Sequence, residues 1–360
     1  MEGQIMEIKR LINCFVPVSV CNFECSYCYI PQITGRKKNA MPEWKLSPPE
    51  IAKALSAQRL GGQCFMNICG DGETLIPKEM PSIIEELLKE GHVLEIVTNG
   101  TLTERFEEIF KIDKVLLERL EFKFSYHYAM LKRKNMLDVF WNNVNNAKKF
   151  GCSFTIELTP HDELIPLIEE IKQDCLKNVG ALCHITTAFN YADNWNLLTS
   201  LSKEEYCKVW GQFDSPMFDF KMSVLGEKRT EYCYAGEYLI SVNIASGYAT
   251  QCYAGIGQNI FDNIEKPIKW LAVGKHCEYP LCFNAHALMV FGAIPELATD
   301  IYYDDIRNRK CKDGTEWLSQ TVKDAFHSKF IETNKRYSIS KKIVNELMVT
   351  CEKIKRKLSR

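Results

Sequence analysis

The residues with the clearest capacity for chemistry are three cysteines in a short stretch, Cys21, Cys25 and Cys28. They form a C-x3-C-x2-C pattern directly after an apolar run. Thiolates this close in sequence can converge on one metal centre, and soft sulfur ligands select zinc, cuprous copper or an iron–sulfur cluster. A closed zinc site wants four ligands, whereas a cluster held by three cysteines keeps one iron open to a small molecule. A zinc loop completed by a distant ligand such as Cys14 is the alternative.

Two later phrases share the order of a known family signature. The cysteine pattern, with Tyr27 just before its last cysteine, resembles the signature of radical S-adenosylmethionine (radical SAM) enzymes. The stretch Cys69-Gly70-Asp71-Gly72-Glu73-Thr74-Leu75 resembles the family's glycine-glutamate motif, and Val97-Thr98-Asn99-Gly100 resembles the phrase after its third strand. All three phrases occur in the family's order, so the chain is identified as a member of this family.

The resemblance implies a cofactor set. Cys21, Cys25 and Cys28 would hold a [4Fe-4S] cluster whose open iron is chelated by SAM. The residues expected around SAM are Tyr27, Gly70, Asp71, Gly72, Glu73, Thr98, Asn99 and Ser125. An electron carrier such as flavodoxin or ferredoxin would reduce the cluster, and reductive cleavage of SAM would give a 5'-deoxyadenosyl radical that removes a hydrogen atom from the substrate.

A second cysteine group follows in the C-terminal half: Cys233, Cys252, Cys277 and Cys282. Its C-x13-G-x4-C opening resembles that of the SPASM and twitch extensions, which carry auxiliary iron–sulfur clusters. The count fits twitch and a single auxiliary [4Fe-4S] cluster better than a full SPASM extension. A structural four-cysteine zinc site is the alternative, because thiolate spacing does not distinguish the metals.

Composition excludes some classes of protein. The 360 residues can bury a large core, and the net charge of -1 lacks the excess positive charge that is typical of nucleic-acid-binding proteins. Sixteen cysteines, several in ligand-like spacing, favour metal ligation in a reducing compartment over a disulfide framework. No stretch has the pattern of a signal peptide or a membrane span, so we expect a cytoplasmic protein with no membrane partner.

The spacing of apolar runs predicts the elements that position these motifs. Strand-like runs occur at 11–18, 63–69, 93–98, 120–126, 152–158 and 181–187, with helical stretches between them. Repeated β/α units of this size predict a parallel sheet covered by helices. The family resemblance converts this into a partial (β/α)6 barrel over 1–190. We expect a connector at 191–228, a twitch-like auxiliary domain at 229–290, and a helical segment at 291–360.

Alternation along two strands predicts what faces the barrel interior. In the fourth strand Lys123, Ser125 and His127 share one face and the aromatic residues share the other. Glu157 and Thr159 repeat the pattern in the fifth strand. We expect the polar faces to point inward, where parallel α/β folds place ligands. His127 and Glu157 are thereby candidates for substrate binding or proton transfer, with hydrogen-bonded core residues as the alternative.

The polar interior favours a small, carbohydrate-like substrate that is oxidised or epimerised. One of the remaining cysteines, such as Cys64 or Cys207, could donate a hydrogen atom. A second class of enzyme is a maturase of ribosomally made peptides. It would need a leader-recognition domain, for which we expect no room before Cys21. A third class is a non-catalytic, zinc-rich structural protein.

Overall fold

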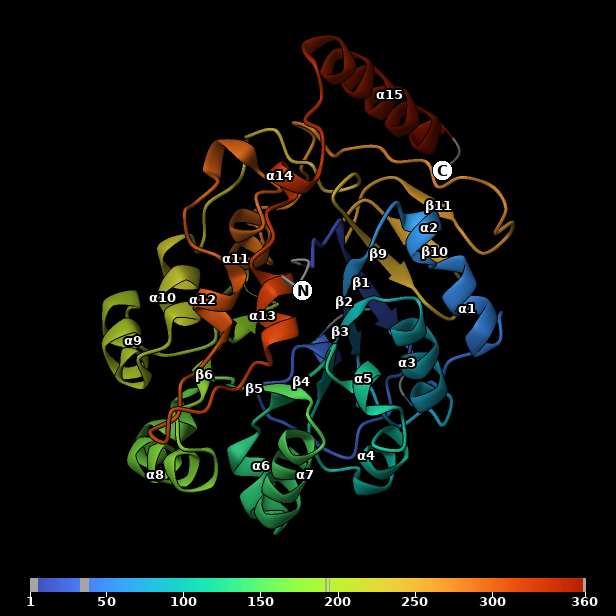
Figure 1. Cartoon of the computed structure of the whole chain (residues 1–360). Helices are drawn as coiled ribbons and strands as arrows, with labels where there is room; N and C mark the ends of the chain where they lie inside the picture. Colours follow the sequence, from blue (N-terminus) through green and yellow to red (C-terminus); the bar gives the residue numbers. More distant parts are fainter. Residues whose placement is uncertain (1–5, 33–38, 192, 194, 359–360) are drawn as a thin grey trace.

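One mixed β-sheet organises the chain in the computed structural model, which describes residues 6–32, 39–191, 193 and 195–358 (Figure 1). Its strand order is β11-β10-β9-β1-β2-β3-β4-β5-β6, and β1 to β6 all run parallel. These six strands are β1 (Arg10–Val16), β2 (Cys64–Gly70), β3 (Val93–Thr98), β4 (Leu120–Ser125), β5 (Ser153–Leu158) and β6 (His184–Ile185). The predicted α/β fold with a six-stranded parallel core is confirmed, although β6 is shorter than expected.

Helices between the strands cover the outer face of the core (Figure 1). They are α1 (Pro48–Ala54), α2 (Ala57–Leu60), α3 (Met80–Lys89), α4 (Thr103–Ile109), α5 (Lys114–Leu117), α6 (Tyr128–Arg133), α7 (Leu137–Lys149) and α8 (Ile168–Val179). A capping box at Ser47 opens α1, with Glu50 accepting a hydrogen bond from the Ser47 amide at 2.8 Å. Ser56 caps α2, which begins shortly after α1 ends.

The two faces of β4 are segregated as the alternation predicts. Phe122 packs on Phe106 of α4 with ring centroids 5.0 Å apart, and Tyr126 packs on Trp141 of α7 at 5.2 Å. The side chains of Phe122 and Tyr126 are both fully buried against these helices. The polar face, carrying Lys123, is therefore left to the barrel interior, which we call the lumen.

The C-terminal half adds strands to the same sheet. Strand β9 (Leu239–Asn243) pairs in parallel with β1, and β10 (Tyr248–Thr250) and β11 (Gly257–Asn259) continue antiparallel. The predicted auxiliary domain at 229–290 thus shares one sheet with the predicted barrel domain. Sequence alternation did not indicate this pairing, because β9 is a short run far from β1 in the chain.

The remaining elements are a hairpin and two groups of helices. The hairpin consists of β7 (Phe189–Asn190) and β8 (Asn196–Leu197), followed by α9 (Lys203–Trp210) and α10 (Pro216–Ser223). A capping box at Ser202 opens α9. The C-terminal helices are α11 (Ala285–Val290), α12 (Tyr303–Arg307), α13 (Gln320–Phe326), α14 (Phe330–Thr333) and α15 (Ile339–Leu358). Short 3-10 turns complete the chain at Ile30–Gln32, Asp162–Leu167, Gly211–Phe213 and Pro295–Leu297.

The C-terminal helices close the amino end of the barrel. Phe65, at the start of β2, packs on Phe326 of α13 at 4.8 Å and on Phe291 at 6.1 Å. Leu11 and Val93, near the starts of β1 and β3, belong to the same buried cluster. Within the described ranges, no helix has the length and apolarity needed to cross a bilayer.

A buried histidine ties β2 to the helical layer. His92 has no exposed surface; its Nδ1 accepts from the Cys64 amide at 3.1 Å, and its Nε2 lies 2.9 Å from the Leu55 carbonyl. The second contact requires a proton on Nε2, so the neutral ring satisfies both partners. Burial lowers the pKa of His92 to about 4.

We predict that His92 makes the fold acid-sensitive. Its folded pKa lies below the unfolded value of 6.5, so its contribution is complete above pH 6.5 and is lost as the pH falls toward 4. A shift of this size corresponds to a loss on the order of 3 kcal/mol. Denaturant unfolding between pH 7 and 4 should show a shallower pH slope for His92→Gln than for wild type. An unchanged slope in His92→Gln would contradict the assignment.

Candidate active site

The first cysteine group lies on the loop that leaves β1. All three cysteines are free thiols, with Cys21 exposed and Cys25 and Cys28 half-buried. Cys25 lies within electrostatic range of both other thiols, and burial raises its pKa to about 11. Among the described residues, no three His, Cys, Asp or Glu side chains converge tightly enough for a single metal ion. The three sulfurs thus occupy one neighbourhood without forming a compact single-ion site.

The glycine-glutamate motif docks on the backbone just before this loop. The Gly72 amide donates to the Val18 carbonyl at 2.7 Å, and the Glu73 amide donates to the Val20 carbonyl at 2.9 Å. A Cβ atom at Gly72 would lie 2.0 Å from the Val20 carbonyl oxygen. Only glycine allows this approach, so its position explains why the motif and the cysteine loop lie side by side.

The Glu73 carboxylate joins the second and third motifs. Its Oε1 accepts from the Thr98 hydroxyl at 2.7 Å and from the Leu75 amide at 3.1 Å. Its Oε2 accepts from the Asn99 amide at 2.7 Å. Burial raises the pKa of Glu73, and these hydrogen bonds oppose that shift. Glu73 therefore orders the turn after β3, a role that the motif alone did not reveal.

An amide and hydroxyl triangle connects that turn back to the cysteine loop. Asn99 donates to the Asn22 side-chain oxygen at 2.7 Å, and Asn22 donates to the Thr101 hydroxyl at 2.8 Å. The Thr101 hydroxyl closes the triangle by donating to Asn99 at 2.6 Å. The three motifs that are separated in sequence thus form one hydrogen-bonded unit.

His127 lies against the cysteine loop. Its Nδ1 is 2.5 Å from the Tyr27 hydroxyl, and the His161 ring packs on the Tyr27 ring in a tilted arrangement with centroids 4.2 Å apart. Burial, with the nearby charge of His161, lowers the pKa of His127 to about 4. The neutral ring can accept the Tyr27 proton, which fits an anchor for the loop. Proton transfer by His127 stays a prediction.

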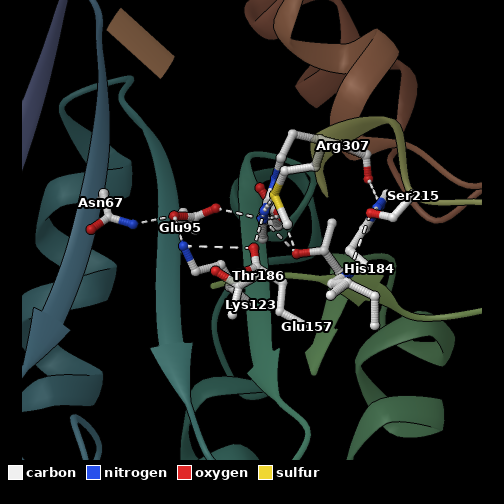
Figure 2. A network of polar contacts seen from close by, with 12 residues as sticks. Asn67, Glu95, Lys123, Glu157, His184, Thr186, Ser215 and Arg307 are labelled. Atoms are coloured by element: carbon white, nitrogen blue, oxygen red, sulfur yellow. Dashed lines mark hydrogen bonds and ion pairs between the residues drawn. The ribbon is translucent and has the colours of Figure 1, made fainter. Parts of the chain in front are cut away.

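A buried ion network forms the floor of the lumen (Figure 2). Arg307 at the end of α12 is fully buried and donates to Glu95 at 2.8 Å and to Glu121 at 3.1 Å. It also donates to Glu157 and to the Thr155 hydroxyl. Sequence analysis missed Arg307, because a single arginine in a charged helical segment gives no signal of a partner 150 residues away.

The wall above this floor carries two amines and a carboxylate. The Lys123 ammonium lies 3.3 Å from Glu95 and 3.8 Å from Glu157. Although burial acts in the opposite direction, Lys123 and Arg307 hold the pKa of Glu157 well below its usual range. Burial lowers the pKa of Lys221 to about 8, and its ammonium donates to the Thr186 hydroxyl at 2.8 Å. These contacts favour Glu157 as a charged structural partner and add Lys221 to the candidates for proton transfer.

The second cysteine group also converges in space. Cys233, Cys252, Cys277 and Cys282 all line one cavity. Each of Cys233, Cys252 and Cys282 is within electrostatic range of Cys277. The four predicted ligands therefore lie together, although they are spread over fifty residues of sequence.

Aromatic side chains occupy the region between the two cysteine groups. Tyr29, next to Cys28, stacks on Tyr191 at 5.5 Å, and Trp195 packs on Phe283, next to Cys282, at 4.1 Å. Tyr253 lies within electrostatic range of Tyr29, Cys69 and Cys282. Cys69 in turn lies within range of Lys123 at the lumen wall. Both cysteine groups thus border the same end of the lumen.

The other predicted site residues fall around this end. Gly70 ends β2 next to Val18, where an added Cβ would lie 2.6 Å from that side chain. Asp71 is half-buried beside Cys69, and Ser125 ends β4 opposite Glu157. The cofactor-binding role of each stays a prediction.

Residues 15–171 match the family described as the radical SAM superfamily. This match supports the radical SAM prediction for the segment that carries the three motifs, and it favours an enzyme over a zinc-rich structural protein. No curated protein matches the sequence.

Solved structures share the fold at low sequence identity. SuiB of Streptococcus suis bound to S-adenosylmethionine has a TM-score of 0.50 and 13% identity, over 71% of this chain and 64% of its own. The chain thus spans less than two thirds of SuiB. Two weaker likenesses are anSMEcpe with bound AdoMet (TM-score 0.45, 16% identity, 94% and 100% of the two chains) and BtrN with AdoMet and 2-DOIA (0.36, 14%, 73% and 77%).

The residues present fit the cofactor that the superfamily implies. Three neighbouring thiols supply soft ligands, and the close approach at Gly72 leaves room for backbone rather than a side chain. Cys21, Cys25 and Cys28 would hold the SAM-binding [4Fe-4S] cluster, with Glu73, Thr98 and Asn99 ordering the adjacent turn.

We predict that Gly72→Ala separates the motif from the cysteine loop. The added methyl must displace the Val20 carbonyl, which should destabilise the fold by about 1–3 kcal/mol and weaken SAM binding. Calorimetry and equilibrium SAM binding on the anaerobic protein would measure both. Gly211→Ala is the matched control, because a Cβ there meets no atom of the described residues within 4 Å. Wild-type SAM affinity in Gly72→Ala would contradict the docking role.

We predict that the two cysteine groups load independently. The Cys25→Ala, Cys28→Ala double variant should lose reductive SAM cleavage and keep the iron of one cluster. The matched Cys252→Ala, Cys277→Ala variant should keep SAM binding and lose the other cluster. Iron and sulfide analysis with EPR spectroscopy measures the outcome. SAM cleavage that survives in the first variant would refute the assignment.

Proposed function

We propose that this radical SAM enzyme acts on a small polar, carbohydrate-like molecule, which it oxidises or epimerises. The observation that carries the substrate class is the charged wall of the lumen, formed by Lys123, Glu157 and Lys221. These groups are already paired within the protein, but each ammonium carries three donors and the carboxylate has two acceptor oxygens. A hydroxyl-rich ligand can form additional hydrogen bonds with them, and an apolar ligand cannot.

The two cysteine groups have different roles in the proposed reaction. With its cluster bound at Cys21, Cys25 and Cys28, the site supplies the electron that cleaves SAM and thereby the radical that removes a hydrogen atom. We propose that Cys233, Cys252, Cys277 and Cys282 hold an auxiliary [4Fe-4S] cluster. Their common cavity and its connection to the lumen through Tyr253 support this proposal.

Lumen residues determine the outcome for the substrate radical. Oxidation requires the radical to lose one electron and one proton, so that the substrate loses two hydrogens overall. The auxiliary cluster would accept the electron. Lys221 is suited to accept the proton, because burial lowers its pKa to about 8 and leaves a fraction of the amine neutral near neutral pH.

The second candidate function is a peptide maturase. Its support is the fold likeness to SuiB, which has also been solved bound to the precursor peptide SuiA. The same cleft would then receive a peptide side chain. The two candidates differ in which molecule stimulates SAM cleavage.

We predict that saccharides or nucleotide sugars stimulate 5'-deoxyadenosine formation and that Lys123→Met loses this stimulation at least tenfold. The reason is the loss of a lumen donor that faces the substrate. Uncoupled SAM cleavage without substrate should persist, since the Lys123 ammonium pairs with Glu95 and Glu157 of the lumen and is not one of the cluster ligands. Chromatography of 5'-deoxyadenosine and mass spectrometry of the substrate measure both.

The control is Lys132→Met, which removes a half-exposed surface lysine paired with Glu170. Loss of two hydrogens indicates oxidation, and unchanged mass with deuterium uptake from heavy water indicates epimerisation. If only a peptide stimulates turnover and is modified, the small-molecule proposal is wrong.

A further inference from the structure

Arg229 lies in the wall of the cavity that the four C-terminal cysteines line. It lies four residues before Cys233 in the sequence, and 8% of its side chain is exposed. The Arg229 charge acts electrostatically on Cys282. A nearly buried cation therefore faces the thiols proposed to hold the auxiliary cluster.

The outer edge of this guanidinium is held in place. Nη2 donates to Glu227 at 2.7 Å and to the Val224 carbonyl at 3.4 Å, and Nη1 lies 3.8 Å from Glu231. These contacts leave the third nitrogen, Nε, which is buried and has no hydrogen-bond partner among the described residues. Five other arginines of the described residues also have a buried Nε without a partner, and Arg229 is set apart from them because it lines the cavity of the four cysteines. Buried donors are normally paired, so the Nε beside this cavity points to an acceptor within it.

We propose that Arg229 donates an Nε–H hydrogen bond to a sulfur of the auxiliary cluster and raises the reduction potential of that cluster. This inference rests on the auxiliary cluster proposed above. The physical reason is charge: the reduced cluster carries one more electron, so a nearby cation and an N–H donor stabilise it more than the oxidised cluster. Arg229 acts through the cluster and is a positioning residue.

In the oxidation that Arg229 would favour, the substrate radical would lose one electron to the auxiliary cluster and one proton to a lumen base. The cluster would thereby be reduced by one electron. A one-electron carrier protein then removes that electron. A higher potential makes the transfer from the radical to the cluster more favourable.

The test is an EPR-monitored redox titration of the anaerobic holoenzyme. In Arg229→Gln the auxiliary midpoint should move to a more negative potential, with at least a tenfold lower ratio of reduced to oxidised cluster at the wild-type midpoint, which is about 59 mV for one electron. Arg229→Lys keeps the charge without the Nε geometry and should shift less. The midpoint of the SAM-binding cluster is the internal reference and should not move.

Lys353→Gln is the matched control. Lys353 lines the same cavity, but its ammonium is already paired with Glu278 at 2.8 Å and with the His276 carbonyl at 3.0 Å. An unchanged auxiliary midpoint in Arg229→Gln with full iron content would overturn the proposal. An equal shift in Lys353→Gln would also overturn the proposal, because the midpoint would then depend on any nearby positive charge and not on the Arg229 Nε–H donor. If Arg229→Gln does not load iron, the same titration is carried out on Arg229→Lys. An auxiliary midpoint equal to that of the wild type in Arg229→Lys would then overturn the proposed Nε–H hydrogen bond. Wild-type protein with one cluster per chain would instead refute the proposed auxiliary cluster.

Discussion

The close approach of Gly72 to the Val20 carbonyl is the constraint on which the candidate site depends. Because the gap has no room for a side chain, the motif after β2 can hydrogen bond directly to the chain that leads into the cysteine loop. Glu73 then receives donors from the turn after β3. Three segments from three strand ends are in this way held in one geometry, as expected at the carboxyl edge of a parallel sheet.

The floor of the lumen depends on a different interaction. Glu95, Glu121 and Glu157 from three adjacent strands would repel one another in a dry interior, and Arg307 compensates them from α12. Burial raises the pKa of Glu121 to about 7 even so. The C-terminal helices are therefore part of the barrel's electrostatics, and their removal would leave the three carboxylates with Lys123 as the remaining nearby cation and Glu121 without its ion-pair partner.

Much of this arrangement could be predicted from local patterns. Strand alternation located β1 to β6 and separated the aromatic face of β4 from its polar face. The three motifs indicated the SAM site, and the spacing from Cys233 to Cys282 indicated the second group. Each of these signals lies within a short stretch of chain or repeats a known spacing.

The missed features depend on contacts between distant residues. Arg307 and Glu157 are 150 residues apart, and β9 pairs with β1 across more than 200 residues. Neither residue type nor periodicity encodes such a partner. The same holds for Lys221, whose lowered pKa arises from burial beside residues of other strands, and for Arg229, whose unpaired Nε is visible only in the folded chain.

Anomalous diffraction at the iron edge from anaerobically grown crystals tests the central claim most directly. We expect two iron peaks per chain, one beside Cys21, Cys25 and Cys28 and one inside the cavity lined by Cys233, Cys252, Cys277 and Cys282. A single iron peak, or a zinc-edge signal in place of iron at the second position, would contradict it.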